Sequence, residues 1–371
     1  MVYSAYGWSC FTYYYTEILG NGVDHVMKPI LAITMGDPAG IGSEVVVKAL
    51  SNPEISKICI PVVIGDYDVL ADANKFCKAN LTLFEITDVK EAQDQQGVLN
   101  FINMGFLTGK NWSYKKVSPL CGKASFKYVQ KGIELAMSGK VHGVVTGPIN
   151  KNALNQAGYN YNGHTEIFAD FTKTKDYGMI LMSGDLRVIH VTTHVAICDV
   201  SDLITQKRVY TVIKLAHDAV KAFGLTNARI AVAGFNPHAG EDGLFGNEEE
   251  TAIIPAINQA KKEGINVEGP FPPDTVFIKA MAGLYDVVVA MYHDQGHIPL
   301  KMHGFKIDAS TGAFTSVSGI NCTVGLPIIR VSVDHGTAFD IAGEGRANED
   351  SMIDAIKAGV MLAKAKFKPE D

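Results

Sequence analysis

The chain has 371 residues, 47% of them hydrophobic and 19% charged, with a formal net charge of −6. This length allows two domains of ordinary size, and the acidic balance excludes a basic surface for nucleic acid. No apolar run reaches the ~20 residues of a membrane-spanning helix. The six cysteines are scattered without a C-x-x-C pair, which indicates reduced thiols rather than disulfides or a cysteine zinc site. We therefore expect a globular cytoplasmic protein with neither membrane nor nucleic-acid partners.

Residues 1–26 differ in composition from the rest of the chain. Seven aromatic side chains crowd between Tyr3 and Tyr15, and the segment has no Lys or Arg. Secretory signals need a basic start and mitochondrial peptides need arginines, so neither description fits. We expect an N-terminal extension of undetermined role, with Met27 as a candidate alternative start.

From Lys28 onward, strand patterns alternate with helix patterns. Short apolar runs predict strands at 30–34, 60–64, 144–148, 178–182, 188–192, 230–234, 286–290 and 328–333. Amphipathic spacing predicts helices through 45–50, 70–73, 121–139, 209–220, 248–263, 275–282 and 353–363. Residues 86–118 are polar and give no pattern. This alternation predicts a mainly parallel sheet with helices on both faces, an α/β fold.

The stretch Met291–Lys301 carries a dense set of polar groups directly after the predicted strand 286–290. In open α/β sheets, ligands bind outside the carboxyl ends of the strands. The stretch contains histidines, a carboxylate, an amide and a lysine, which together suit a metal and an anion. We therefore expect it to form the centre of the functional site.

A zinc-protease helix is the competing interpretation of this stretch. His293 and His297 have the i, i+4 spacing of that motif. However, Gly296 and Pro299 disfavour a helix, and Asp294 stands where the motif has Glu. We predict that the stretch is not helical.

Three histidines each lie just beyond a predicted strand: His194, His238 and His293. Neutral imidazoles are ligands for zinc and other divalent transition metals, and three protein ligands leave positions open for substrate. The alternative is that each histidine is hydrogen-bonded scaffolding. His190 lies inside its strand, so we expect it in the core or behind the ligands.

Two glycine-rich loops and one polar island also adjoin strand or helix ends. Residues 36–42 join a strand to a helix start, where anions bind readily, but they match neither G-x-G-x-x-G nor a P-loop. Residues 334–348 either bring backbone N–H groups close to a ligand or form an ordinary long turn. Residues 163–166 either contact a phosphate or cap the following helix. Without a Rossmann fingerprint, any dinucleotide would bind in another fold.

Together these motifs resemble the 4-hydroxythreonine-4-phosphate dehydrogenase (PdxA) family. The resemblance runs from about residue 27 to the C-terminal helix. It rests on Gly36–Gly42, Gly163–Glu166, Asn236–Glu241, Tyr292–Gly296, Gly325–Pro327 and Asp334–Ala338. The last loop is also similar to that of isocitrate and isopropylmalate dehydrogenases, which bind NAD without a Rossmann motif.

The resemblance implies two α/β/α domains of the isocitrate dehydrogenase type. The first would comprise residues 27–150 with 310–371, and the second residues 151–309. It also implies a homodimer whose active sites lie in the cleft and at the subunit interface, with residues from both copies.

The resemblance also implies a role for each matching residue. A divalent ion (Zn, Mg, Mn or Co) would be held by His194, His238 and His293. The substrate would contact His164, Thr165, Lys301, Asn321 and Arg330. The cofactor NAD would meet the loop through His335, Gly336, Thr337, Asp340, Gly343 and Asn348. As a hypothesis for the mechanism, Lys301 is the candidate base or proton relay, or otherwise a fixed charge for phosphate or carboxylate, and Asp294 orients a ligand histidine.

One departure from the family pattern bears on the substrate. The vitamin B6 enzymes have Leu-Pro after Gln-Gly, whereas this chain has His297–Pro299. That variant resembles the branch acting on 4-phospho-D-threonate and 4-phospho-D-erythronate. We therefore expect NAD-dependent oxidation at C3 followed by decarboxylation, with 4-hydroxythreonine-4-phosphate oxidation in pyridoxal phosphate synthesis as the alternative.

Three further functions remain open. A metal-dependent hydrolase or lyase would need no NAD, and the loop 335–348 argues against it. Dehydrogenation of a cyclic cis-diol would not require the phosphate contacts, yet Lys301, Asn321 and Arg330 are present. A non-enzymatic sensor would bind ligand without forming NADH.

Overall fold

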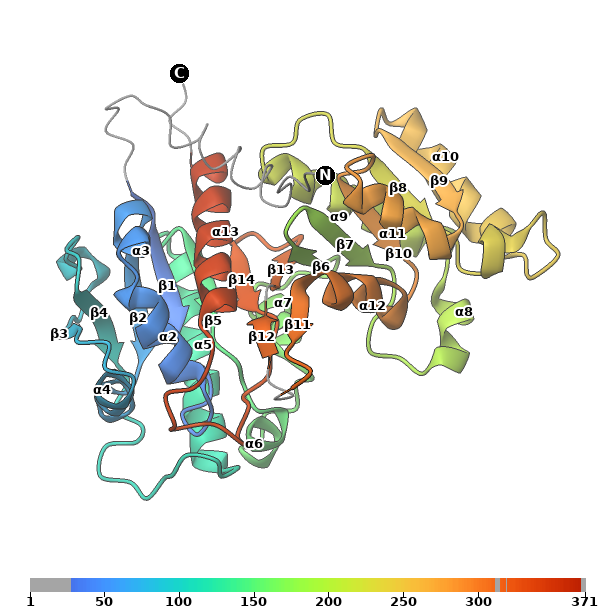
Figure 1. The fold of residues 1–371 in the computed structure, drawn as a ribbon. Helices are drawn as coiled ribbons and strands as arrows, with labels where there is room; N and C mark the ends of the chain where they lie inside the picture. Colours follow the sequence, from blue (N-terminus) through green and yellow to red (C-terminus); the bar gives the residue numbers. More distant parts are fainter. Residues whose placement is uncertain (1–27, 311–313, 318, 368–371) are drawn as a thin grey trace, which may run out of the picture.

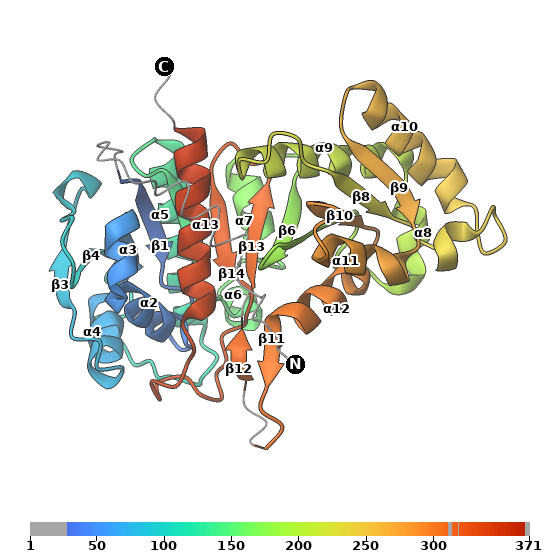
Figure 2. The same cartoon turned by 45° about the horizontal axis from the view of Figure 1, so that its top comes forward.

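The computed structural model describes residues 28–310, 314–317 and 319–367, so the expected extension at residues 1–26 lies outside the described residues. A 12-stranded sheet runs through the described part of the chain, in the order β3-β4-β2-β1-β5-β14-β13-β6-β7-β10-β8-β9 (Figure 1). Its strands are β1 Ile30–Thr34, β2 Ile60–Gly65, β3 Thr82–Glu85, β4 Val98–Asn103, β5 Gly143–Thr146, β6 Gly178–Ser183, β7 Leu186–His190, β8 Ile230–Ala233, β9 Val267–Phe271, β10 Val287–Ala290, β13 Ile320–Val324 and β14 Arg330–Val333. A separate antiparallel pair is formed by β11 Phe305–Ile307 and β12 Phe314–Val317, which project from the body in Figure 2.

Most neighbouring strands are parallel. The run from β3 to β14 is parallel throughout, and so is the run β7-β10-β8-β9. Between these runs, β13 and β6 pair antiparallel with their neighbours and with each other. The predicted α/β fold with a mainly parallel sheet is therefore confirmed.

Helices cover both faces of the sheet. The α-helices are α2 Gly42–Ser51, α3 Pro53–Ile58, α4 Tyr67–Phe76, α5 Pro119–Met137, α6 Lys151–Gln156, α7 His164–Phe171, α8 Val200–Leu203, α9 Gln206–Ala222, α10 Ile254–Lys262, α11 Pro273–Met281, α12 His293–Gly304 and α13 Asp350–Lys366. Gly132 of α5 packs against Val144, whereas Gly359 of α13 packs against Val145. Because consecutive strand residues point to opposite faces, α5 and α13 lie on opposite sides of β5, as Figure 1 shows. None of the helices in the described residues is long and apolar enough to span a membrane.

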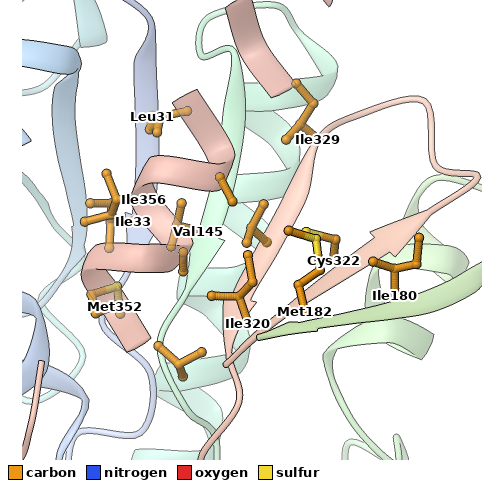
Figure 3. Packing of buried hydrophobic residues seen from close by; sticks show 14 of the residues in the cluster. Leu31, Ile33, Val145, Ile180, Met182, Ile320, Cys322, Ile329, Met352 and Ile356 are labelled. Carbon is orange, nitrogen blue, oxygen red and sulfur yellow. The ribbon is translucent and has the colours of Figure 1, made fainter. Parts of the chain in front are cut away.

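The core is continuous where the two parallel runs meet. Ile320 and Cys322 of β13 lie opposite Met182 and Ile180 of β6, and all four side chains are buried (Figure 3). Strands β1 to β5, β14 and β13 occupy one half of the sheet, and β6 to β10 occupy the other. The expected division into two domains, residues 27–150 with 310–371 and residues 151–309, stays a prediction.

The prediction that residues after β10 are not helical is wrong. Residues His293–Gly304 form helix α12, with Pro299 inside it. Gly296 is what allows the helix to lie on β7, because a Cβ there would be 2.3 Å from Nε2 of His190. Leu300 of α12 is fully buried. Tertiary packing therefore outweighs the low helix propensity of glycine and proline.

Candidate active site

The three histidine loops leave the sheet side by side. Strands β7, β10 and β8 are adjacent and parallel, so their carboxyl ends share one edge. Beyond the strands, Val191 N–H donates to Ala290 O at 2.8 Å, and Thr192 N–H donates to Met291 O at 3.1 Å. The structure therefore brings the loops bearing His194, His238 and His293 to the same edge, as their positions predict.

His293 and His194 approach each other within one copy of the chain. Their ring centroids are 5.7 Å apart. Nδ1 of His293 lies 2.6 Å from Oδ1 of Asp294, which leaves Nε2 of the ring available to a ligand. Burial, together with the nearby positive charge of Lys151, lowers the pKa of His194 and favours its neutral form. A pair of imidazoles is a suitable donor set for a divalent ion.

His238 occupies a different position. It is exposed in the short turn Pro237–Gly240 after β8, and its backbone is left-handed, with φ of 56°. Among the described residues of one chain, no three His, Cys, Asp or Glu side chains are grouped to hold a metal ion. The three predicted ligands thus share an edge of the sheet without forming a complete site in a single copy.

His297 and His190 lie behind His293. The His297 ring is stacked on that of His293, with centroids 3.6 Å apart and planes 11° apart. His190 lies on the other side, with its centroid 4.7 Å from that of His297. As expected for a residue inside a strand, His190 is buried. Burial lowers the pKa of His297 to about 4 and the pKa of His190 well below its usual value.

Arg330, a predicted substrate-binding residue, is buried and held by neighbouring side chains. It begins β14 and is only 3% exposed. Its two terminal nitrogens donate to Thr323 Oγ1 at 2.9 Å and to Thr146 Oγ1 at 3.0 Å, and its guanidinium lies 5.6 Å from the centre of the Phe168 ring. Burial lowers the Arg330 pKa to about 10. The hydroxyls and the ring hold the guanidinium in place without neutralising its charge.

His164 and Thr165 border this guanidinium from the start of α7. Thr165 Oγ1 is 3.4 Å from Thr323 Oγ1, and Nε2 of His164 is shielded from solvent with no partner among the described residues. Burial and the charge of Arg330 hold the pKa of His164 well below its usual range. The carboxylate of Glu166 acts electrostatically on both Arg330 and His194, so Arg330 and the histidine pair are neighbours.

Lys301 and Asn321 lie at the junction of α12 with β13 and β14. Lys301 Nζ is 3.4 Å from Oδ2 of Asp334 and 4.6 Å from the centre of the Phe305 ring. Burial raises the pKa of Asp334, while Lys301, His335 and His293 oppose this effect. Asn321 donates to Met179 Sδ at 2.6 Å, and its Oδ1 has no partner in the described part of the chain.

The glycine-rich loop after β14 rests on the other glycine motif. Ile41 N–H donates to Thr337 O at 3.0 Å, and the carboxylate of Glu44 accepts from the N–H groups of Gly343 at 2.6 Å and Ala347 at 3.4 Å. Residues 36–44 are all buried. The motif at residues 36–42 is therefore a support for this loop, and its buried position leaves little room for an anion at the start of α2.

The predicted cofactor residues divide into exposed and anchored groups. Gly336 is exposed, and a Cβ there would meet nothing within 4 Å. His335 Nδ1 lies 3.0 Å from Gly336 O, and its Nε2 has no partner among the described residues. Asp340 accepts from Lys115 Nζ through its carbonyl at 2.8 Å, and Asn348 donates to Asp350 at 3.0 Å. The unpartnered imidazole and the open space beside Gly336 fit a bound cofactor.

Several supporting residues had no role assigned to them from the sequence. Thr146 and Thr323 hold Arg330, and Glu44 holds the loop after β14. Gln295 donates to Gly234 O at 2.8 Å and accepts from Met291 N–H at 2.6 Å, linking the ends of β8 and β10. Each acts through backbone groups or neighbouring hydroxyls that only the folded chain brings together.

A mainly parallel α/β sheet with histidines, a buried arginine and a glycine-rich loop at its strand ends has the layout of an α/β enzyme. The chain belongs to the PdxA family, because the family model for "Pyridoxal phosphate biosynthetic protein PdxA" matches residues 57–359.

Curated relatives and a solved structure cover most of the chain. A protein of Oceanobacillus iheyensis named "Putative D-threonate 4-phosphate dehydrogenase" is 48% identical over 341 residues, 91% of this chain and 99% of that protein. The Salmonella typhimurium "D-threonate 4-phosphate dehydrogenase" is 46% identical, covering 90% of this chain and 98% of its own. A crystal structure of a 4-hydroxythreonine-4-phosphate dehydrogenase from Klebsiella pneumoniae superimposes with a TM-score of 0.80 at 41% identity, covering 92% of this chain and 99% of that one.

Proposed function

We propose that the protein is an NAD- and divalent-metal-dependent dehydrogenase. It oxidises the C3 hydroxyl of a 4-phosphorylated four-carbon 3-hydroxy acid, which then loses CO2. The substrate is 4-phospho-D-threonate or its epimer 4-phospho-D-erythronate. The names of the curated relatives at 46–48% identity support the threonate over the vitamin B6 intermediate. The observation that carries the proposal is the buried Arg330 beside the histidine pair, since it provides for an anionic substrate next to a metal-binding donor set.

The metal ligands would be His194 and His293 of one copy and His238 of a second copy. A divalent ion on these imidazoles would supply Lewis-acid polarisation of the substrate oxygens. Asp294 holds His293 through Nδ1 at 2.6 Å and thereby presents Nε2. Imidazole nitrogens are suitable ligands for a divalent ion. Because one copy does not bring all three histidines together, the second copy would supply the third ligand.

Arg330, His164 and Thr165 would bind the anionic ends of the substrate. The guanidinium has a fixed orientation because two threonine hydroxyls accept from it, so its planar fork meets a phosphate or carboxylate without rearrangement. The neutral His164 adds a hydrogen-bonding nitrogen that has no other partner in the described residues.

Lys301 and the loop after β14 would complete the reaction centre. NAD would be held along His335, Gly336, Thr337, Asp340, Gly343 and Asn348 and would supply the acceptor for the hydride of C3, while Lys301 would take up the hydroxyl proton. The resulting β-keto acid loses its carboxylate as CO2, and a proton returned to C2 gives a phosphorylated three-carbon ketone. We propose Lys301 for both proton transfers. In support, its Nζ lies 3.4 Å from Oδ2 of Asp334, a carboxylate on which His335 and His293 also act electrostatically.

The working form would be a cytoplasmic homodimer. Large apolar side chains are exposed on the loops that carry the ligand histidines and on α12: Val195, Ile197, Leu244, Phe245, Ile298 and Met302. Exposed apolar groups gathered near one edge are typical of a surface that another molecule covers. A second copy at this edge would cover them and bring in the missing histidine.

The test is NADH formation by the purified protein with added divalent ion, comparing kcat/KM for 4-phospho-D-threonate and 4-phosphohydroxy-L-threonine. We expect the threonate to be preferred. A preference for the amino acid would return the protein to vitamin B6 synthesis. Binding of both acids without NADH would instead identify a sensor.

A further inference from the structure

The loop that carries His238 has a left-handed backbone over six consecutive residues. From His238 to Gly243 the φ angles are 56°, 58°, 85°, 45°, 54° and 87°. Only Gly240 and Gly243 of these six are glycines. For the others this conformation is unfavourable, because Cβ crowds the neighbouring carbonyl oxygen. Such a turn persists only where its surroundings hold it.

A buried carboxylate, that of Glu249, holds this turn. Glu249 is 2% exposed and begins the π-helical segment Glu249–Ile253. Its Oε1 accepts from the N–H groups of Phe235 at 2.7 Å and Asn236 at 2.8 Å, and its Oε2 accepts from Asn236 Nδ2 at 2.8 Å. A Cβ on Gly240 would lie 2.9 Å from Oε2, so the turn closes directly over the carboxylate.

The same region is tied to the start of α12. Gln295 accepts from Met291 N–H and donates to the carbonyl of Gly234, which adjoins Phe235. Gln295 therefore connects the segment 234–236, which Glu249 holds, to the start of α12, which carries His293. A shift of the turn would move His238 relative to the start of α12 and His293.

We propose that Glu249 is a positioning residue for His238, fixing the strained turn so that its imidazole is presented for a metal ion shared with a second copy. This inference rests on the metal site of the proposed function. Three donors converge on the carboxylate, and all three belong to the two residues that lead into the turn.

The test is Co²⁺ binding by the full-length protein, measured by calorimetry and by visible absorption, which reports ligand geometry. In Glu249→Gln one acceptor oxygen is replaced by an NH2 group, which cannot accept a hydrogen bond from the N–H donors of Phe235 and Asn236. We expect Co²⁺ affinity to fall about 10-fold or more and the spectrum to change. Glu250→Gln, the exposed neighbour, should match the wild type. The melting temperatures of the metal-free proteins measure how much each substitution destabilises the fold itself.

Two further variants make the result independent of folding yield. Asn236→Ser keeps the main-chain bond to Glu249 but removes the amide donor Nδ2, so Co²⁺ affinity should fall several-fold. Adding Ala239→Gly to Glu249→Gln should recover part of the lost affinity, because glycine adopts the left-handed conformation without strain.

Each outcome has a distinct meaning. Wild-type affinity and spectrum in Glu249→Gln or Asn236→Ser, with only the melting temperature lowered, would overturn the positioning role alone. Absence of Co²⁺ binding in the wild type, or binding that His238→Ala leaves unchanged, would overturn the proposed ligand set and this inference with it.

Discussion

Nδ1 of His293 lies 2.6 Å from Oδ1 of Asp294, its immediate neighbour in α12. The contact fixes one nitrogen of the imidazole and leaves the other free. A carboxylate in this position sets the tautomer of a ligand histidine and raises its basicity. This contact supports the prediction from the sequence that Asp294 orients a ligand histidine. The role of Asp294 itself stays a prediction.

Asp294→Asn should weaken divalent-metal binding. The amide keeps the shape of the side chain but loses its charge, so we expect metal affinity to fall about 10- to 100-fold. Calorimetric titration of the metal-free protein measures the change. Because Asp294 is exposed, the melting temperature should hardly move. An unchanged affinity would show that Asp294 does not orient the ligand.

Arg330→Lys should damage substrate binding selectively. Lysine keeps the positive charge but lacks the planar fork that spans Thr146 and Thr323. Losing one charge-assisted contact to the substrate should raise KM about 10- to 100-fold. Metal affinity should stay near the wild-type value. A KM within about twofold of wild type would contradict the anion-binding role.

Glu44→Gln should weaken cofactor binding without touching the substrate. Its carboxylate accepts from Gly343 and Ala347 in the predicted cofactor loop. We expect the Kd for NAD to rise several-fold, because the amide repels one of these N–H groups. Fluorescence titration measures it, with Glu54→Gln on the exposed surface of α3 as the control. An equal loss of substrate affinity would point to general damage.

Acid should destabilise the fold through the stacked histidines. Burial lowers the pKa of His297 to about 4 in the folded chain, whereas an unfolded histidine titrates near ~6.5. Between these values the unfolded chain binds the proton more readily, so stability falls as pH drops from about 6.5 towards 4. Melting temperatures across this range should fall less steeply in His297→Leu than in wild type. His217→Gln on α9 is the control, and an unchanged slope in His297→Leu would refute the explanation.

The shared site predicts complementation between two inactive variants. His238→Ala and His293→Ala should each lack activity. If each site takes His293 from one copy and His238 from the other, mixed dimers regain one intact site. Random exchange of subunits should then restore about a quarter of wild-type activity. No recovery in dimers that demonstrably exchange would place His238 and His293 of each site in the same copy.

Most of the fold was predictable from local pattern. The apolar, β-branched run 30–34 predicts a strand, and β1 spans those residues. Helix spacing similarly predicts the helix at 121–139, which α5 occupies apart from its ends. These elements are buried on the faces that their periodicity implies, so sequence and packing agree.

The elements and site residues that were not predicted depend on contacts between segments far apart in the sequence. Residues 86–118 gave no pattern, yet Val98–Asn103 form β4 because β2 and β3 pair with it on both sides. The helix after β10 was not predicted because Gly296 was taken as a residue that disfavours a helix. In the structure a glycine is needed at this position because the ring of His190 leaves no room for a Cβ. Among the site residues, the histidines could be proposed from their positions after strands. Glu44 and Glu249 could not, since their partners are backbone groups of other segments.

The account is tested most directly by measuring NADH and CO2 formed from 4-phospho-D-threonate by the purified protein with NAD and a divalent ion. We predict one NADH and one CO2 for each substrate molecule consumed, with both lost in Arg330→Lys at low substrate concentration. NADH without CO2, or no NADH from the threonate while 4-phosphohydroxy-L-threonine is oxidised, would contradict it.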